Sequence, residues 1–146
     1  MREPGSSFAE GRGKDRLSSD RDGEIGSDSR APMADCVFCG IAAKTIPSRI
    51  VVEKDGLVAF HDTKPQAPTH VLIVPKRHIG TLNDLAATDA DMVGRLILLG
   101  AEVAKDLGLD QSGYRLVFNT GAGAGQTVLH IHLHLLGGRA LAWPPG

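Results

Sequence analysis

The chain has 146 residues, a formal net charge of −1 and 42% hydrophobic residues. This length fits one domain with a modest core, and the near-neutral charge gives no bulk attraction to nucleic acid or to an anionic membrane. No apolar run reaches the roughly 18–20 residues of a membrane span, and the N-terminus lacks the apolar segment of a secretory signal. We therefore expect neither a nucleic-acid partner nor a membrane partner.

The first segment of the chain differs in composition from the rest. Residues 1–33 are rich in Gly, Ser, Arg and Asp and contain few large apolar side chains. Such a segment buries too little apolar surface to offset the entropy lost on folding. The sequence predicts a disordered N-terminal extension over residues 1–33 and a folded domain over residues 34–146.

The folded part shows short strand patterns and one long helical pattern. A short helix is expected over residues 35–44, and strands bounded by turn residues are expected over 50–54, 57–61, 70–75, 114–119 and 128–136. Asp55-Gly56 is a hairpin turn signal. Apolar residues then recur at helical spacing from Met92 to Leu107, with Thr88 as the expected N-cap and Gly108 at the end. We predict an α+β fold with a five-stranded antiparallel sheet.

The last predicted strand, residues 128–136, carries His130, His132 and His134 at alternate positions. Side chains alternate across a strand, so the three imidazoles share one face. The opposite, core-facing side is expected to hold Leu129, Ile131, Leu133 and Leu135. Three interpretations fit this pattern: nucleophilic attack by a neutral imidazole on an electrophile such as phosphorus, a metal centre, or histidines satisfied by hydrogen bonds at the sheet surface.

The loop before this strand, from Asn119 to Thr127, has glycines at positions 121, 123 and 125. Glycine tolerates positive φ, so such a loop can turn several N–H groups towards an anion. No Lys-Ser/Thr pair follows, which excludes a Walker A loop. A glycine hairpin loop is the alternative, but the three nearby imidazoles favour a phosphate site.

Cys36 and Cys39 are the only cysteines. A Cys-x-x-Cys pair is too closely spaced to brace a fold as a disulfide, which favours the cytosol as the compartment. The pair fits a structural zinc site if two further ligands exist, inert reduced thiols, or a redox pair. The redox interpretation is disfavoured because no thioredoxin-like strand and helix surround the pair.

Three other side chains each allow two interpretations. Asp62, at a strand end, fits either a sugar-binding carboxylate or a strand-end cap. His70, at the start of the next strand, fits either a group that assists at the phosphate or a partly buried histidine. Trp143 fits either a packed anchor or a contact in an oligomer.

These motifs together resemble one family. The run from His130 to Leu136 resembles the signature of the histidine triad (HIT) superfamily. The segments Pro65–Lys76, Gly113-Tyr114-Arg115, Gly125-Gln126, Leu136–Arg139 and Trp143–Gly146 resemble its Hint branch, the purine nucleoside phosphoramidases. The resemblance runs from about Asp35 to Gly146 and implies the HIT-like fold.

The resemblance implies a nucleotide hydrolase that cleaves the P–N bond of purine nucleoside 5′-phosphoramidates and related acyl-nucleotides. His132 is the implied nucleophile, and the covalent nucleotidyl-histidine would release AMP or GMP. His134 and His70 would orient or protonate groups, and Thr127, where the family usually has Ser, keeps the hydroxyl. Two alternatives stay open. One is a nucleotide-binding or scaffold protein with incidental hydrolysis. The other is a dinucleoside polyphosphate hydrolase of another branch, which the Trp143–Gly146 tail weakens.

The resemblance also implies binding residues and partners. Phosphate and ribose are expected to contact Asp62, Asn119, Gly125, Gln126 and Thr127. The purine pocket is expected to contain Val37, Phe38, Ile46 and Phe60. A structural zinc is expected on Cys36, Cys39, His78 and His130. Family members are homodimers with a continuous sheet, and the tail bearing Trp143 would reach the partner's site.

Overall fold

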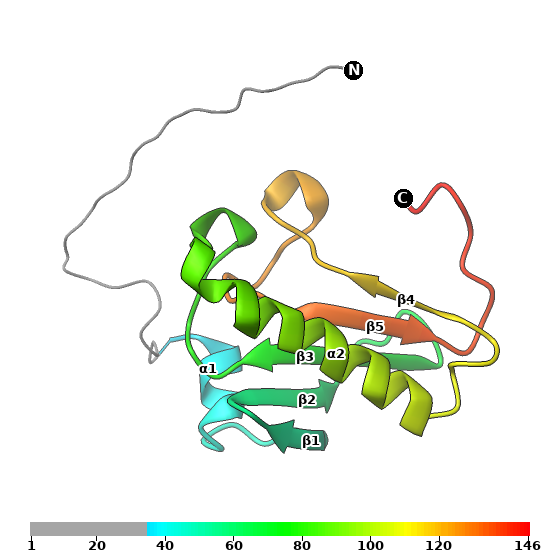
Figure 1. Cartoon of the computed structure of the whole chain (residues 1–146), viewed down its shortest axis with the longest axis horizontal. Coiled ribbons are helices and arrows are strands. Elements are labelled where there is room, and N and C mark those ends of the chain that lie inside the picture. The colour runs from blue at the N-terminus through cyan, green and yellow to red at the C-terminus, as the bar shows by residue number, and fades with distance from the viewer. Residues whose placement is uncertain (1–34) are drawn as a thin grey trace. The chain divides into compact units, whose positions relative to one another are not determined.

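The structure, a computed structural model, describes residues 35–146, and the disordered extension predicted for residues 1–33 lies outside the described residues. The order of helices and strands in the described part is shown in Figure 1: α1 (Val37–Ala42), β1 (Ile50–Lys54), β2 (Leu57–His61), β3 (Thr69–Pro75), α2 (Ala90–Asp106), β4 (Tyr114–Val117) and β5 (Leu133–Gly137). Three short 3₁₀ turns, Leu82–Asp84, Ala87–Asp89 and Ala122–Ala124, lie in the loops.

The five strands form one antiparallel sheet in the order β1-β2-β3-β5-β4, as Figure 1 shows. This confirms the predicted α+β class and the HIT-like arrangement of a sheet with one long and one short helix. Asp55 and Gly56, which join β1 to β2, have φ values of 53° and 77°. Such paired positive φ angles are those of the tight hairpin turn that the sequence predicts.

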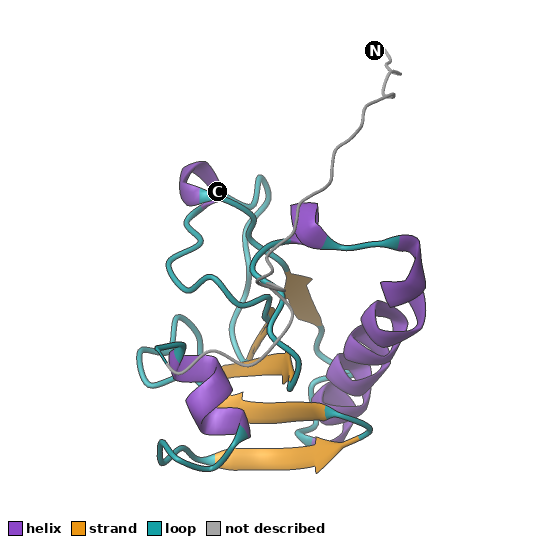
Figure 2. Ribbon diagram, turned by 90° about the vertical axis from the view of Figure 1, so that its left-hand side faces the viewer, coloured by secondary structure: helices purple, strands orange, loops and turns teal. Residues whose placement is uncertain are grey.

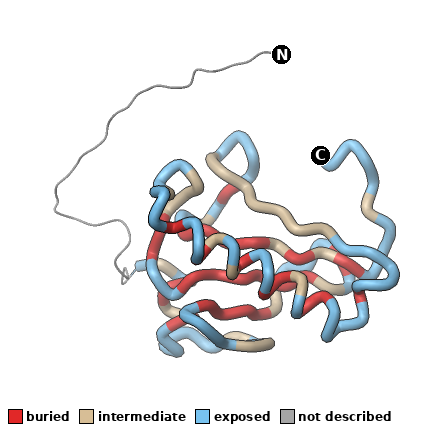
Figure 3. Tube along the Cα trace, in the orientation of Figure 1, coloured by how far each residue is buried: buried red, intermediate tan, exposed pale blue. Residues whose placement is uncertain are grey.

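The two helices cover opposite faces of the sheet (Figure 2). Alternate residues of β3 divide between these faces, because successive side chains of a strand point in opposite directions. Val71 and Ile73 belong to the cluster under α2, whereas Leu72 and Val74 belong to the cluster under α1. In Figure 3 the buried residues follow the central strands and the inner side of α2.

Helix α2 begins one residue later than the sequence predicts. Asp89, not Thr88, is the N-cap, and a 3₁₀ turn over Ala87–Asp89 leads into the helix. The Asp89 carboxylate is buried, accepts from the N–H of Ala86 and pairs with Arg77, so Asp89 fixes the entry to the helix. None of the described helices is long and apolar enough to cross a bilayer.

The histidine-bearing segment is only partly a strand, which corrects the prediction for residues 128–136. β5 begins at Leu133, and residues 128–132 lie outside the regular structure. The pairing of β5 with β3 stops at Ile73 opposite Leu133, and β3 itself ends two residues later at Pro75, which has no N–H to extend a ladder. Leu129 is 63% exposed and does not join the core. Ile131 is buried with Leu133 and Leu135 in the cluster under α2, so side chains still alternate from residue 130 onward.

Candidate functional site

The three histidines of the motif remain together on the α1 side of the sheet. The ring centroids of His132 and His134 are 4.9 Å apart, and Phe38 of α1 packs edge-on against His132 with centroids 5.0 Å apart. His130 is fully buried, and its ring lies 6.0 Å from that of Phe38. The short helix α1 therefore packs against the histidine-bearing segment and forms one side of the candidate site.

His132 is arranged as a neutral imidazole with one free ring nitrogen. Its Nδ1 lies 2.8 Å from the backbone carbonyl oxygen of His130. A carbonyl only accepts, so Nδ1 carries the proton and Nε2 carries the lone pair. Burial lowers the pKa of His132, although the hydrogen bond to His130 opposes this shift. At neutral pH, Nε2 of His132 has a nucleophilic lone pair.

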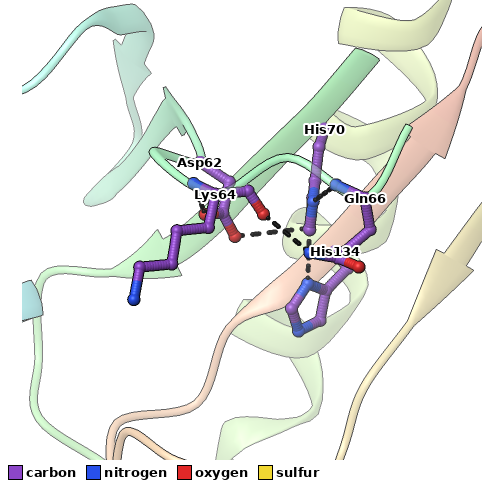
Figure 4. A network of polar contacts seen from close by, with 5 residues as sticks. All are labelled: Asp62, Lys64, Gln66, His70 and His134. Carbon is purple, nitrogen blue, oxygen red and sulfur yellow. Dashed lines mark hydrogen bonds and ion pairs between the residues drawn. The ribbon is translucent and has the colours of Figure 1, made fainter. Parts of the chain in front are cut away.

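His134 and His70 meet across the β3–β5 pair, as Figure 4 shows. His134 lies opposite Leu72, and His70 lies opposite Leu136, so the two histidines are diagonal neighbours on one face. Nε2 of His70 is 2.9 Å from Nδ1 of His134, and one oxygen of Asp62 lies 3.4 Å from the same Nε2. Burial lowers the pKa of His70, and the nearby Asp62 carboxylate opposes this shift.

The second nitrogen of His70 faces the backbone. The N–H of Gln66 donates to Nδ1 of His70 over 3.0 Å, so that nitrogen is an acceptor and the proton of His70 is on Nε2. Nε2 of His70 therefore donates to Nδ1 of His134, whose proton is on its own Nε2. That Nε2 is buried and has no hydrogen-bond partner within residues 35–146.

Three further side chains form a second cluster with His130, and each of the four offers one sulfur or ring nitrogen. The four ligand atoms lie within 4.8 Å of one another and belong to Cys36, Cys39, His78 and His130. Nδ1 of His130 is 3.4 Å from Sγ of Cys36 and 3.5 Å from Sγ of Cys39, and Nδ1 of His78 is 3.4 Å from Sγ of Cys39. This brings together all four residues of the predicted metal set.

The donor set and spacing fit a tetrahedral metal ion. A tetrahedral zinc with thiolate and imidazole ligands separates sulfur from nitrogen by about 3.5 Å. Nε2 of His130 is 2.8 Å from the carbonyl oxygen of Pro75, so Nε2 carries the proton and Nδ1 presents its lone pair to the cluster. The Cys36, Cys39, His78 and His130 cluster could therefore hold a metal.

A second group of potential ligands, Asp62, His70 and His134, also lies within 4.8 Å. The geometry of His70 opposes a metal there. Its Nδ1 lone pair already accepts from the N–H of Gln66, so a metal on Nε2 would require an imidazolate. The hydrogen-bonded pattern instead suits the transfer or orientation of a proton.

Burial keeps these imidazoles neutral. It lowers the pKa of His130 and of His134 from 6.5 to about 4 in each case, with smaller contributions from neighbouring histidines. The Pro75 carbonyl opposes the shift at His130, and the Asp62 carboxylate opposes it at His134. The site therefore offers uncharged lone pairs and N–H donors at neutral pH.

The predicted purine pocket divides into buried and exposed members. Phe38 and Phe60 are buried and pack edge-to-face with centroids 5.5 Å apart. Val37 and Ile46 are 40% and 37% exposed. Ile46 packs closely on α1, because a Cβ atom at Gly40 would lie 2.5 Å from its Cδ1. The structure therefore places an apolar surface beside the histidines, on α1 and β2.

The glycine loop leads directly into the histidine segment. Gly121 and Gly125 have φ values of 85° and 86°, which glycine adopts without strain. Gln126 is buried, and its amide bonds the N–H of Gly121 and the carbonyls of Gly80 and Val128. Its side chain thus holds the loop in shape, while Thr127 is exposed and Asn119 is half-buried. Contact of these residues with a nucleotide stays a prediction.

Two surface cavities lie away from the imidazoles. One, of about 460 Å³, is lined by residues of β1, β2 and α2, among them Leu57 and Leu99. The other, of about 310 Å³, adjoins it near Arg95. Leu57 and Leu99 belong to the cluster under α2, so the larger cavity is on the face opposite the histidines and lacks the candidate catalytic groups.

Sequence reasoning missed the backbone groups that orient the rings. The N–H of Gln66 and the carbonyl of Pro75 each set the protonation of one histidine. For His132, the partner is the carbonyl of His130 in the same segment. Side-chain motifs do not encode such contacts.

Comparison with known proteins identifies relatives of this chain. The family described as HIT domain matches residues 43–141. A purine nucleoside phosphoramidase of Escherichia coli (strain K12) is 48% identical over 105 residues, which cover 72% of this chain and 88% of that protein.

Two solved structures are also similar. The crystal structure of a HIT family hydrolase from Legionella pneumophila Philadelphia 1 matches with a TM-score of 0.76 and 50% identity, and covers 77% of this chain and 100% of that one. A Zn-bound histidine triad family protein from Mycobacterium smegmatis matches with a TM-score of 0.65 and 30% identity, over 77% of this chain and 80% of that one. Cys36 and Cys39 precede the family match, so only two of the four candidate metal ligands lie within it.

Proposed function

This chain belongs to the HIT domain family, and from this premise we propose that it hydrolyses the P–N bond of purine nucleoside 5′-phosphoramidates and related acyl-nucleotides. The products are AMP or GMP and the free amine. The single observation that carries the proposal is the state of His132. Its Nδ1 is held by a carbonyl, so Nε2 is left with a lone pair, and the ring packs against Phe38.

The reaction would proceed in two steps: transfer of the nucleotide to His132 and hydrolysis of the nucleotidyl-histidine. Nε2 of His132 attacks the α-phosphorus, a P–N bond to the imidazole forms, and the P–N bond to the amine breaks. The departing nitrogen takes up a proton, for which the hydroxyl of Thr127 and the Nε2–H of His134 are the candidate donors. Water then attacks phosphorus, its proton restores the donor, and the nucleoside monophosphate leaves with His132 regenerated.

The remaining side chains would bind the nucleotide. The purine would contact an apolar surface made of Val37, Phe38, Ile46 and Phe60. The ribose hydroxyls would contact the carboxylate of Asp62. Asn119, Gly125 and Thr127 would hold the phosphate and ribose, where hydrogen-bond donors stabilise charge on non-bridging oxygens. Gln126 would contribute by fixing the loop.

We also propose that the sulfur-containing cluster binds a structural zinc ion. Cys36, Cys39, His78 and His130 supply four ligands, which closes a tetrahedral shell and leaves no position for substrate. The ion would join α1 to the segment before β5. His130 would thus bind the metal through its ring, while its backbone carbonyl orients the nucleophile His132.

A homodimer with a continuous sheet is the assembly we propose. Within the described residues the sheet has two edge strands, β1 and β4. β4 is favoured because Arg115 on this strand bonds the carbonyl of Ala142 in the C-terminal tail. That tail places Trp143, which is 82% exposed, near the same edge. Sedimentation analysis should give twice the chain mass.

Turnover of a fluorogenic adenosine phosphoramidate tests the proposed activity. We expect multiple turnovers and a covalent adduct at His132 that mass spectrometry detects after acid quenching. A scaffold protein would bind AMP with a shift in melting temperature but show background hydrolysis. Faster cleavage of diadenosine polyphosphates than of phosphoramidates would contradict the substrate class. The cytosolic location inferred from the cysteines stays a prediction.

A further inference from the structure

A chain of hydrogen bonds leads from the protein surface to the candidate proton donor. Arg139, two residues after β5, donates from Nε and Nη2 to the carbonyl of Gln66 over 3.2 Å and 2.9 Å. The N–H of Gln66 donates to His70, and His70 bonds His134. Three of these residues, Gln66, His70 and His134, appear in Figure 4. The chain ends at the buried Nε2 of His134, which has no partner in the described part.

The proton pattern of this chain depends chiefly on one backbone N–H, that of Gln66, and the Asp62 carboxylate 3.4 Å from Nε2 of His70 favours the same tautomer. Neutral imidazole has two tautomers, and the group facing one nitrogen selects between them. If Nδ1 of His70 lost its donor, His70 could place its proton there. Its Nε2 would then accept from Nδ1 of His134. The proton of His134 would move off Nε2, and the reacting atoms would face a lone pair instead of a donor.

The position of Gln66 is held from outside the loop that contains it. Asp62 accepts from the N–H of Lys64, and the Gln66 amide donates to the Lys64 carbonyl. These contacts shape residues 62–66 locally. Arg139 adds the link to the C-terminal side of β5, where a Cβ atom at Gly138 would lie 2.9 Å from Pro68. The guanidinium therefore fixes Gln66 relative to the strand that carries His134.

We propose that Gln66, clamped by Arg139, is a positioning residue whose backbone N–H sets the tautomers of His70 and His134, so that His134 presents an N–H to the substrate. The role in catalysis rests on the proposed function, whereas the tautomers are a property of the free protein. Arg139 acts only through Gln66 and touches no reacting atom.

The test combines nitrogen-15 NMR of the imidazole rings with kinetics. In the wild-type protein at neutral pH, His70 and His134 should each show the proton on Nε2. Gln66→Pro removes the N–H, whereas Gln66→Ala keeps it and removes only the side-chain bond. Gln66→Pro should mix the tautomers of both histidines and lower kcat about tenfold or more, with KM changed less than about twofold. Gln66→Ala should keep the wild-type tautomers.

Arg139 provides a second arm that does not alter the backbone of the loop. Arg139→Gln should lower kcat by a few-fold and broaden the ring nitrogen signals, and Arg139→Lys should restore most of both. Arg95→Gln, which removes an arginine from an exposed ion pair on α2, is the control and should change neither.

The outcomes separate this proposal from the proposed function. A proton on Nδ1 of His70 in the wild-type protein overturns the proposal, as do unchanged tautomers in a folded Gln66→Pro variant. If Gln66→Pro fails to fold, unchanged signals and kcat in Arg139→Gln overturn it equally. Wild-type protein with the expected tautomers but no turnover supports the proton pattern and refutes the phosphoramidase activity alone.

Discussion

Two histidine clusters lie side by side on one face of the sheet, yet the backbone prepares them for different chemistry. In the cluster of Cys36, Cys39, His78 and His130, the carbonyl of Pro75 accepts from Nε2–H of His130. The lone pair on Nδ1 of His130 therefore faces the thiols. In the relay formed by His70 and His134, the N–H of Gln66 occupies a lone pair and leaves N–H groups facing inward. A backbone acceptor thus leaves His130 with a lone pair suited to a metal ligand, whereas a backbone donor leaves His70 with an N–H suited to proton transfer.

Burial does not explain the difference between the clusters. It lowers the pKa of His130 and of His134 to the same value, about 4, so both rings are neutral at pH 7. The clusters differ in which nitrogen carries the proton and in whether sulfur is nearby. His132 lies between His130 and His134 in the sequence and contacts both clusters. The carbonyl of His130 orients its ring, and the ring of His134 packs against it.

The largest expected effect separates His132 from the metal cluster. His132→Ala should lower phosphoramidate turnover by at least about 10⁴-fold, because the attacking group is lost. Metal content should be unchanged, since His132 is not among the four candidate ligands. Steady-state kinetics and elemental analysis of the same preparation measure both. A variant that keeps more than about a tenth of the wild-type rate would remove His132 from the role of nucleophile.

Substitutions at the four candidate metal ligands should instead lower metal content and stability. Cys39→Ser should remove the bound metal and lower the free energy of unfolding by several kcal/mol, because binding energy at a structural zinc site is folding energy. Urea denaturation with and without a chelator measures the loss. The matched variant Cys36→Ser should behave alike, since both thiols contact His130. Full stability with no metal in wild-type protein would contradict the zinc proposal.

The sequence predicts the side chains of both clusters better than their geometry. Alternation of His and apolar residues places His130, His132 and His134 on one face, and that face is observed. The predicted start of the last strand was wrong, because the histidine pattern does not show where pairing with the neighbouring strand stops. That pairing stops at Ile73 opposite Leu133, two residues before β3 ends at Pro75.

Contacts made by the backbone account for the rest of what the sequence does not reveal. The Cys-x-x-Cys pair and the resemblance to the HIT family predict the four members of the metal cluster. Neither predicts that Gln66 and Arg139 connect to His70, because this link depends on how two loops meet after folding. The N-cap of α2 fell on Asp89 for a similar reason, its buried pairing with Arg77.

The pH dependence of the free energy of unfolding should differ between the wild-type protein and a variant that lacks the imidazole of His134. Burial lowers the pKa of His134 from 6.5 in the unfolded chain to about 4 in the folded protein. Between these values the unfolded state binds more protons at His134, so the contribution of this residue to stability falls as the pH drops from about 6.5 to about 4 and is constant outside this window. For His134 the loss is at most about 3 kcal/mol. Chemical denaturation of metal-free His134→Gln should show a shallower pH dependence, and an unchanged slope would contradict the assigned burial effect.

The smallest expected effect concerns the glycine loop, which serves the nucleotide side of the site and not the metal side. Gly125→Ala forces a side chain into positive φ, where the strain is about 1 kcal/mol, whereas Gly123 has no such φ and its Cβ meets open space. We therefore expect Gly125→Ala to raise KM by a few-fold and Gly123→Ala to leave it unchanged. Both should keep the wild-type metal content. Because the two substitutions add the same methyl group within one turn of chain, equal effects on KM would show that loop conformation does not contribute to phosphate binding.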